Sequence, residues 1–259
     1  MRFCMTNRIA VSGKLQALGL RRRKPVKRPV GSRIHAELAA GIGMRILDGT
    51  YPAGTLLPNE AEWGRMFSAS RTAVREAIKT LNGKGLLRSR PKVGSRVEPR
   101  ERWNLLDRDV MAWHCAAMDK TAFLISLQEV RRILEPGAAV LAAERRTPEQ
   151  LVQLEEALEG MRNAADGEAM VEPDVRFHLA LLACANNELL SPFGIIIEQA
   201  LANMFAFTTR HNTKPGRVVP MHADVVNAIA AQKPEAARQA MTTLLDDTDE
   251  IIGKPLIGA

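Results

Sequence analysis

The sequence predicts a mainly α-helical protein, with an N-terminal winged helix-turn-helix followed by a C-terminal, all-helical antiparallel bundle. Within residues 32–98, three helical patterns precede two short extended segments joined by a turn. From about Asp107 onward, apolar residues keep helical spacing without strand-like alternation. Aromatic residues make up only 4% of the chain, which favours helices packed through aliphatic side chains.

The first folded unit is expected to begin with a helix near Ser32. Ile34, Leu38, Ile42 and Ile46 recur every four residues and give this segment one apolar stripe. A second helix begins after residue 58, because Asn59 and Glu62 have the spacing of a capping box. The sequence therefore predicts two helices before the turn at residues 68–70.

A third helix follows that turn and is the candidate recognition element. Its inner face is apolar, with Val74, Ala77, Ile78 and Leu81. Its outer face carries Arg71, Thr72, Arg75 and Lys79. A helix that is buried on one face and basic on the other can enter the major groove of DNA. The alternative is an ordinary solvated face.

The extended segments favour the DNA-binding interpretation. Residues 86–90 and 95–98 are predicted strands, joined by a hairpin tip at residues 91–94. Arg90, Lys92 and Arg96 place a second basic element where a wing would meet the DNA backbone. Two basic elements in this order point to DNA more strongly than either one alone.

Charge is distributed unevenly along the chain, whose net charge is +7. Residues 1–33 hold ten basic and no acidic residues. Residues 34–102 hold twelve basic and seven acidic residues, whereas residues 103–259 hold fourteen basic and twenty-two acidic residues. A basic front half indicates contact with a polyanion. Residues 1–31 are expected to be a basic flexible arm, either touching DNA phosphates or without a role.

Cysteine usage and hydropathy bear on location. Cys4, Cys115 and Cys184 are far apart and odd in number, so a reducing cytoplasm is expected. No apolar run approaches the roughly 20 residues that cross a bilayer, so no membrane partner is expected.

Seven helices are predicted after the linker at residues 99–106, within a domain that spans residues 107–255. The predicted helices cover residues 107–118, 121–144, 148–165, 172–185, 188–209, 219–232 and 234–252.

Three of these helices carry ionisable side chains on their apolar faces. Arg131 lies on the core-facing stripe of its helix, with Glu135 as its local partner. Asp174 and His178 are four residues apart on one apolar face, and His222 lies on another. The aspartate and the histidines could bind Zn²⁺, Mn²⁺ or Ni²⁺. Alternatively, Arg131 and the histidines could bind a carboxylate, or the group could be an internal ion-pair network.

Two stretches resemble a known family of regulators. Ile46-Leu47-Asp48-Gly49, Leu57-Pro58-Asn59-Glu60 and Ser70-Arg71-Thr72-Ala73-Val74-Arg75-Glu76-Ala77 resemble the DNA-binding domain of the GntR family. Arg131-Arg132-Ile133-Leu134-Glu135-Pro136, Asp174 to His178, and His222 resemble the FCD ligand-sensing domain of its FadR-type subfamily. The resemblance covers most of the chain after residue 31.

This resemblance implies a homodimeric transcriptional regulator that binds a palindromic DNA operator, most commonly a repressor released by its effector. It implies that the DNA contacts come from the recognition helix and the wing, through Ser70, Arg71, Thr72, Arg75, Lys92 and Gly94. It also implies effector binding in the helical domain, which dimerises, through Arg131, Asp174, His178, Asn203, Arg210 and His222.

The chain departs from the family pattern at two positions. Leu244 stands where metal-binding members have a further histidine, which leaves Asp174, His178 and His222 as the metal ligands. Ala61 stands where many members have a DNA-contacting arginine.

Residues 103–110 with Trp113 are similar to the interdomain stretch of D-galactonate-responsive and related sugar-acid regulators, which implies a sugar acid or another carboxylate as effector.

Three alternative functions of the helical domain remain. The helical domain could be a metal-dependent hydrolase, could only dimerise, or could belong to a nucleoid-type protein without a sensor. The chain lacks HExxH, a nucleophile elbow and a phosphate loop, so it is not expected to be an enzyme.

Overall fold

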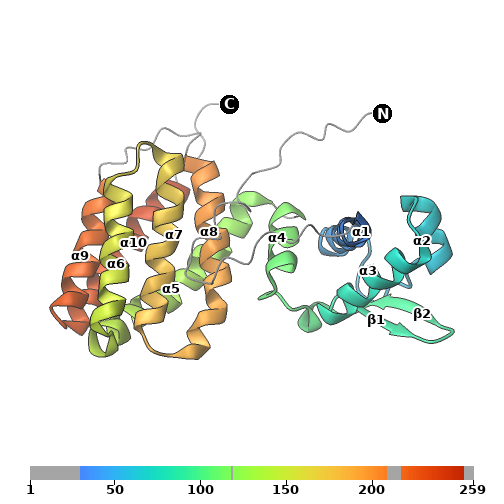
Figure 1. Ribbon diagram of the computed structural model, residues 1–259, viewed down its shortest axis with the longest axis horizontal. Coiled ribbons are helices and arrows are strands. Elements are labelled where there is room, and N and C mark those ends of the chain that lie inside the picture. The colour runs from blue at the N-terminus through green and yellow to red at the C-terminus, as the bar shows by residue number, and fades with distance from the viewer. Residues whose placement is uncertain (1–29, 118, 209–216, 254–259) are drawn as a thin grey trace.

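The computed structural model describes residues 30–117, 119–208 and 217–253. Figure 1 shows two lobes, a small one with the two strands and a larger helical bundle, with helix α4 between them. The predicted arm up to residue 29, Cys4 and Arg210 lie outside the described residues. The mainly helical fold predicted from the sequence is confirmed.

The small lobe contains three helices and a hairpin in the predicted order. They are α1 (Val30–Leu47), α2 (Glu60–Phe67), α3 (Arg71–Gly83), β1 (Leu87–Arg90) and β2 (Gly94–Val97). The strands are antiparallel, and Leu87 pairs with Val97. The predicted capping box is present, because the Asn59 side chain accepts from the backbone of Glu62, whose carboxylate accepts from the backbone N–H of Asn59.

The core of this lobe forms where the inner faces of α1 and α3 meet. Trp63 of α2 is fully buried against the rings of Tyr51 and Phe67. The predicted apolar stripe is buried at Leu38, Ile42 and Ile46, but Ile34 is exposed. Burying the inner face of α3 leaves its charged face toward solvent, which positions the candidate recognition surface.

The second lobe is a bundle of six α-helices among the described residues, shown at the left of Figure 1. The α-helices are α5 (Lys120–Arg145), α6 (Pro148–Arg162), α7 (Gly167–Cys184), α8 (Gly194–Thr208), α9 (Val218–Ala230) and α10 (Pro234–Gly253). A 3₁₀ helix, η3 (Glu188–Phe193), precedes α8.

Two of these helices differ from the prediction. Helix α7 begins at Gly167 rather than at residue 172, because Asp166 caps it and Pro173 lies inside the helix instead of at its start. The segment predicted as one helix over residues 188–209 is divided, because Pro192 falls in the 3₁₀ turn before α8.

Helix α4 (Arg108–Ala117) follows a 3₁₀ turn, η2 (Arg100–Arg102), and packs against both lobes. Val110 belongs to the core of the small lobe. Met111 and Cys115 pack with Phe123 of α5 and Ile196 of α8. The helix after the linker therefore connects the two cores.

No helix among the described residues combines the length and apolar character needed to cross a membrane.

Candidate functional site

The predicted DNA-reading side chains of α3 lie at its exposed N-terminal end. Arg71 and Thr72 are exposed, and Arg75 is exposed with its Nε 3.5 Å from Glu60 Oε1. The Ser70 hydroxyl accepts a hydrogen bond from the backbone N–H of Ala73 at 3.2 Å, so Ser70 caps the helix. Free backbone N–H groups at a helix N-terminus favour a phosphate nearby.

The wing is shaped by two residues with positive φ. Lys92 has φ 63° and Gly94 has φ 106°, both at the hairpin tip. At Gly94 glycine is the natural residue, because a Cβ there would also lie 3.3 Å from the Leu56 side chain. The Arg96 guanidinium donates to the Gly54 carbonyl and ties the wing to the loop before α2. The turn therefore holds the exposed Lys92 at the tip.

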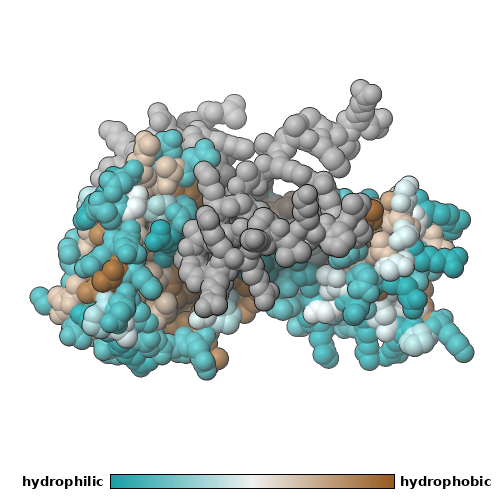
Figure 2. Space-filling model, viewed as in Figure 1, coloured by the Kyte–Doolittle hydropathy of each residue, from teal (hydrophilic) through white to brown (hydrophobic). Residues whose placement is uncertain are grey.

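A groove of about 790 Å³ lies between α3 and the wing. Figure 2 shows mostly hydrophilic residues along the lower edge of the small lobe, where the wing lies in Figure 1. The residues that line the groove include Thr72, Arg75, Lys79, Arg90, Lys92 and Gly94. The structure thus brings four of the six predicted DNA-contacting residues to one basic groove, with Ser70 and Arg71 at the adjoining helix end.

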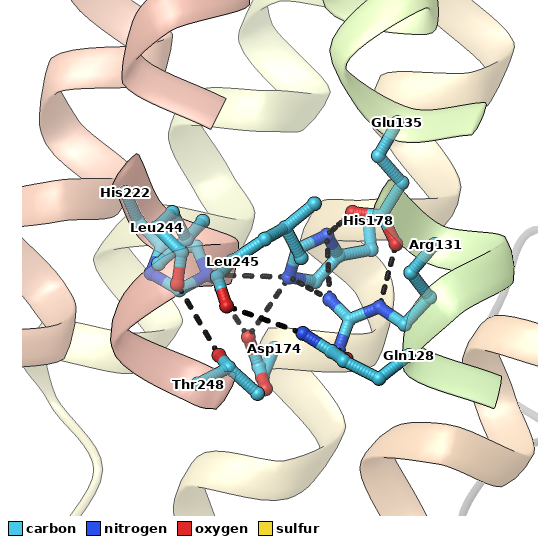
Figure 3. A network of polar contacts seen from close by, with 9 residues as sticks. All are labelled: Gln128, Arg131, Glu135, Asp174, His178, His222, Leu244, Leu245 and Thr248. Atoms are coloured by element: carbon cyan, nitrogen blue, oxygen red, sulfur yellow. Dashed lines mark hydrogen bonds and ion pairs between the residues drawn. The ribbon is translucent and has the colours of Figure 1, made fainter. Parts of the chain in front are cut away.

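The second cluster lies inside the bundle, where α5, α7 and α9 face one another (Figure 3). Arg131 of α5, His178 of α7 and His222 of α9 are each only 2% exposed. Asp174, one turn before His178, has a side chain that is 18% exposed. The four inward-facing residues predicted from helical periodicity therefore lie together.

Arg131 is held by partners within the protein. Its Nε donates to Glu135 Oε1 at 2.6 Å, and its Nη1 donates to Gln128 Oε1 at 3.3 Å. Its Nη2 lies 3.2 Å from His178 Nε2. All three guanidinium nitrogens are thus engaged, which leaves one N–H on each of Nη1 and Nη2 for an effector carboxylate.

Glu135 is fully buried and balances this charge. Its Oε2 atom lies 2.6 Å from His178 Nδ1. Burial alone would raise the pKa of Glu135, but the charges of Arg131 and His178 outweigh it and lower the pKa to about 2. Burial would likewise lower the pKa of His178, but the Glu135 carboxylate raises it. Glu135 therefore remains ionised beside the histidine.

Three candidate ligand atoms converge beside this ion pair. Asp174 Oδ1 lies 3.0 Å from His222 Nε2 and 3.5 Å from His178 Nε2, and the two Nε2 atoms are 3.4 Å apart. A metal–ligand bond of about 2.1 Å places neighbouring ligand atoms about 3.0–3.4 Å apart, so this spacing fits one ion. These three are the residues that can hold a metal among those the structure describes.

The electrostatics of the cluster also fit a cation. His222 Nδ1 lies 2.8 Å from the Val218 carbonyl, an acceptor, so its proton lies on Nδ1 and its Nε2 lone pair faces Asp174. Asp174 Oδ1 is buried and accepts no hydrogen bond. Burial alone would raise the pKa of Asp174, but the contacts with both histidines lower it. A proton or a metal ion is needed between these electron pairs.

Three other positions, Asn203, Leu244 and Ala61, contribute no polar group to either cluster. Asn203 contacts Cys115 Sγ at 3.0 Å and the Gln199 carbonyl at 2.6 Å, which places it at the contact between α8 and α4. Leu244 is buried, and its carbonyl accepts from Thr248. Ala61 is exposed on α2 and offers DNA no polar group. The effector role of Asn203 therefore stays a prediction.

Two members of the cluster are not among the predicted site residues. Glu135 is predicted only as the local partner of Arg131, and nothing in the sequence singles out Gln128, which bonds to both Arg131 and the Leu245 carbonyl. The i, i+4 spacing of Arg131 and Glu135 was the available signal for the ion pair, but the contact of Glu135 with His178 crosses between helices.

Comparison with known families covers both lobes. The model for bacterial regulatory proteins of the gntR family matches residues 34–97, and the FCD domain model matches residues 126–247. The first match contains α2, α3 and the wing, and the second contains the Asp174 cluster.

Individual relatives agree with these matches. YieP, an HTH-type transcriptional regulator of Escherichia coli, is 33% identical over 82% of this chain and 93% of its own length. The galactonate operon transcriptional repressor of Escherichia coli is 34% identical over 79% of this chain and 90% of its own. The Listeria monocytogenes protein Lar shares the fold, with a TM-score of 0.58 and 18% identity over 88% of this chain and 98% of its own. The chain belongs to the GntR family, as a DNA-binding, non-enzymatic transcriptional regulator with an FCD domain.

Proposed function

We propose that this regulator controls genes for the catabolism of a sugar acid or a related carboxylate, as a repressor released by its effector. The observation that carries the proposal is the buried cluster of Arg131, Asp174, His178 and His222 inside the FCD domain. A bundle without a ligand would more readily bury apolar side chains there. The galactonate operon repressor, 34% identical, supports a sugar acid as the effector class.

The cluster supports two modes of effector binding. In the first, Asp174, His178 and His222 hold Zn²⁺, Mn²⁺ or Ni²⁺. An effector carboxylate then takes the coordination position that a histidine in place of Leu244 would fill. In the second, no metal takes part, and the carboxylate meets Arg131 and the histidines directly. The effector carboxylate thus contacts the metal ion in the first mode and the remaining N–H groups of Arg131 in the second.

The signal reaches DNA through α4 in this proposal. Helices α5 and α8 pack against α4, and α4 contributes Val110 to the core of the small lobe. An effector shifts the equilibrium between two placements of the winged domains only if it binds them with different affinity. A homodimer would place two recognition helices on a palindromic operator, one per half-site.

A binding screen tests the effector class. Thermal unfolding is measured with galactonate, lactate and small dicarboxylates, with and without a chelator. We expect a rise in melting temperature with a sugar acid, and loss of this rise in Arg131→Ala if the carboxylate binds Arg131 directly. A chelator abolishes the rise only in the metal-dependent mode. If no carboxylate shifts the transition, the sensor assignment is wrong.

Operator release is measured on the same protein. Fluorescence anisotropy of a labelled operator duplex should fall when the active sugar acid is added, and light scattering should give the mass of a dimer. Arg162→Ala, which removes an exposed arginine of α6, serves as the charge-matched control and should respond as the wild type does. Tighter DNA binding on addition of effector would contradict the repressor assignment.

A further inference from the structure

We propose that Glu135 is a positioning residue: with Arg131 it fixes the proton of His178 on Nδ1, so that the Nε2 lone pair faces Asp174 and can bind a cation. The inference rests on the proposed cation site at Asp174, His178 and His222. It adds a carboxylate that lies outside the ligand set and comes from a different helix.

The two nitrogens of His178 face different carboxylates, Glu135 at Nδ1 and Asp174 at Nε2. Nδ1 lies 2.6 Å from Glu135 Oε2, and an ionised carboxylate only accepts. Arg131 Nη2 lies 3.2 Å from Nε2 and 3.5 Å from Nδ1, so it flanks both nitrogens, and only the close contact with Glu135 distinguishes them. Glu135 Oε2 makes no hydrogen bond of regular geometry, but a lone pair on Nδ1 would be repelled by a carboxylate oxygen 2.6 Å away. Figure 3 shows Nδ1 toward Glu135, and the neutral ring therefore carries its proton on Nδ1.

His222 is held in the same protonation state by a different partner. Its Nδ1 faces the Val218 carbonyl at 2.8 Å, one turn earlier in α9. Phe177 packs edge-on against both imidazole rings, with centroids 5.3 Å and 4.7 Å away, and restricts their rotation. Both Nε2 atoms consequently point toward Asp174 Oδ1, and each histidine has its own acceptor behind it.

A buried acceptor behind a ligating imidazole is what metal sites require. It fixes the tautomer and makes the ligating nitrogen more basic, and its loss typically lowers metal affinity 10- to 100-fold. Each oxygen of Glu135 has its own partner. Oε1 accepts from Arg131 Nε at 2.6 Å, and Oε2 faces His178. The ion pair therefore aligns the carboxylate for the histidine.

This arrangement makes Glu135→Gln diagnostic. A glutamine amide has the same shape but only one acceptor oxygen. That oxygen faces Arg131, whose charge makes the stronger bond, so the amide NH₂ faces His178 Nδ1. The histidine must then accept at Nδ1 and carry its proton on Nε2, toward Asp174. In the double variant Arg131→Met with Glu135→Gln, the oxygen is free to turn back to His178, which restores the original tautomer.

The first measurement needs no metal. Nitrogen-15 NMR of the full-length, chelator-treated protein reports the His178 tautomer. Because the Glu135 carboxylate raises the pKa of His178, spectra are recorded at increasing pH until the ring is neutral. We expect Nδ1–H in the wild type, Nε2–H in Glu135→Gln, and Nδ1–H again in the double variant. Nε2–H in the neutral ring of the wild type would overturn the proposal, as would an unchanged tautomer in Glu135→Gln.

The second measurement is the affinity for Zn²⁺ by calorimetric titration of the same proteins. Glu135→Gln should bind 10- to 100-fold more weakly than the wild type, and the double variant should recover most of this loss. Glu129→Gln, on the exposed face of the same helix, is the matched control and should bind as the wild type does. A purely structural role for Glu135 predicts further weakening in the double variant, and that result would overturn the proposal.

The two measurements separate this inference from the proposed function. If the wild type binds no Zn²⁺, the cation site is wrong, while the NMR experiment still decides whether Glu135 fixes the tautomer. If Zn²⁺ binds but His178 carries its proton on Nε2, the cation site stands and the role of Glu135 fails. Should Glu135→Gln not fold, as judged by circular dichroism, the wild-type tautomer alone decides the outcome.

Discussion

Arg71 and Arg75 show how single residues divide between folding and function in the small lobe. Both side chains are exposed on α3, four residues apart, while Val74 and Ala77 between and beyond them are fully buried. Helical geometry separates the two sets, so the arginines can change without loss of core packing. Arg75 has one weak partner, Glu60 at 3.5 Å, and remains accessible.

Arg71→Ala should weaken operator binding and leave the fold unchanged. Losing one base or phosphate contact costs about 1–3 kcal/mol, which is a 5- to 150-fold loss of affinity. The checks are anisotropy with an operator duplex and the melting temperature. Arg162→Ala on α6 is the control, since it removes the same charge far from the groove. Wild-type affinity in Arg71→Ala would mean that α3 is not the recognition helix.

The contact between α1 and α4 illustrates packing at the level of elements. Gly43 of α1 faces the indole of Trp113, and a Cβ at this glycine would lie 2.6 Å from Trp113 Cζ3. The two helices can approach this closely only because one of them has no side chain at the contact. Lys84 Nζ also lies over this ring, 5.6 Å from its centroid.

Gly43→Ala should force α1 and α4 apart and destabilise the protein. Overpacking of this kind costs about 1–3 kcal/mol, measurable by chemical denaturation with tryptophan fluorescence. In Gly83→Ala, the Cβ meets no atom within 4 Å, so the same substitution should leave stability unchanged or slightly raised. Trp113→Leu should relieve the cost of Gly43→Ala when the two are combined. Additive losses in the double variant would show that this contact is not the cause.

At the scale of the whole molecule, Lys84 joins the recognition unit to α4. Its ammonium group lies 2.6 Å from Asp107 and 2.8 Å from Asp109, at the C-terminal end of α3. The Lys84 side chain is only 11% exposed. Burial alone would raise the pKa of Asp107, but the bond from Lys84 lowers it, and the pKa of Lys84 is raised by both aspartates against its own burial.

Lys84→Met should destabilise the joint at neutral pH by about 1.5–3 kcal/mol, the usual value for hydrogen bonds to charged groups. Because the pKa of Asp107 is lowered, its contribution is present above the ordinary value of 3.8 and is lost as pH falls through the folded pKa. Because the pKa of Lys84 is raised, its contribution to stability is complete below the ordinary lysine pKa of 10.5 and is lost as pH rises through the folded pKa.

The measurement is denaturation of wild type and Lys84→Met across this pH range. The stability difference should stay constant near neutral pH and shrink below about pH 4. Lys233→Met, which removes an exposed lysine before α10, is the control and should show no such difference. A difference that persists at low pH would assign the effect to lost packing rather than to the ion pair.

Prediction from the sequence succeeded where the pattern is local. The order of α1 to β2, the capping box at Asn59 and the inward direction of Arg131 follow from periodicity and short spacing. It failed at Gly167 and Pro192, because a proline is compatible with a helix interior, a helix start or a 3₁₀ turn, and packing selects among them. The domain boundaries stay a prediction, since α4 packs against both lobes.

By itself, the sequence determined which helices carry inward-facing charge, which face of α3 is basic, and which family the chain resembles. Only the tertiary structure decided that Glu135 of α5 faces His178 of α7, that Lys84 joins Asp107 and Asp109, and that Asn203 lies with Cys115. The reason is physical: a helical repeat fixes the direction of a side chain about its own axis, whereas contacts between helices depend on how the helices are packed together.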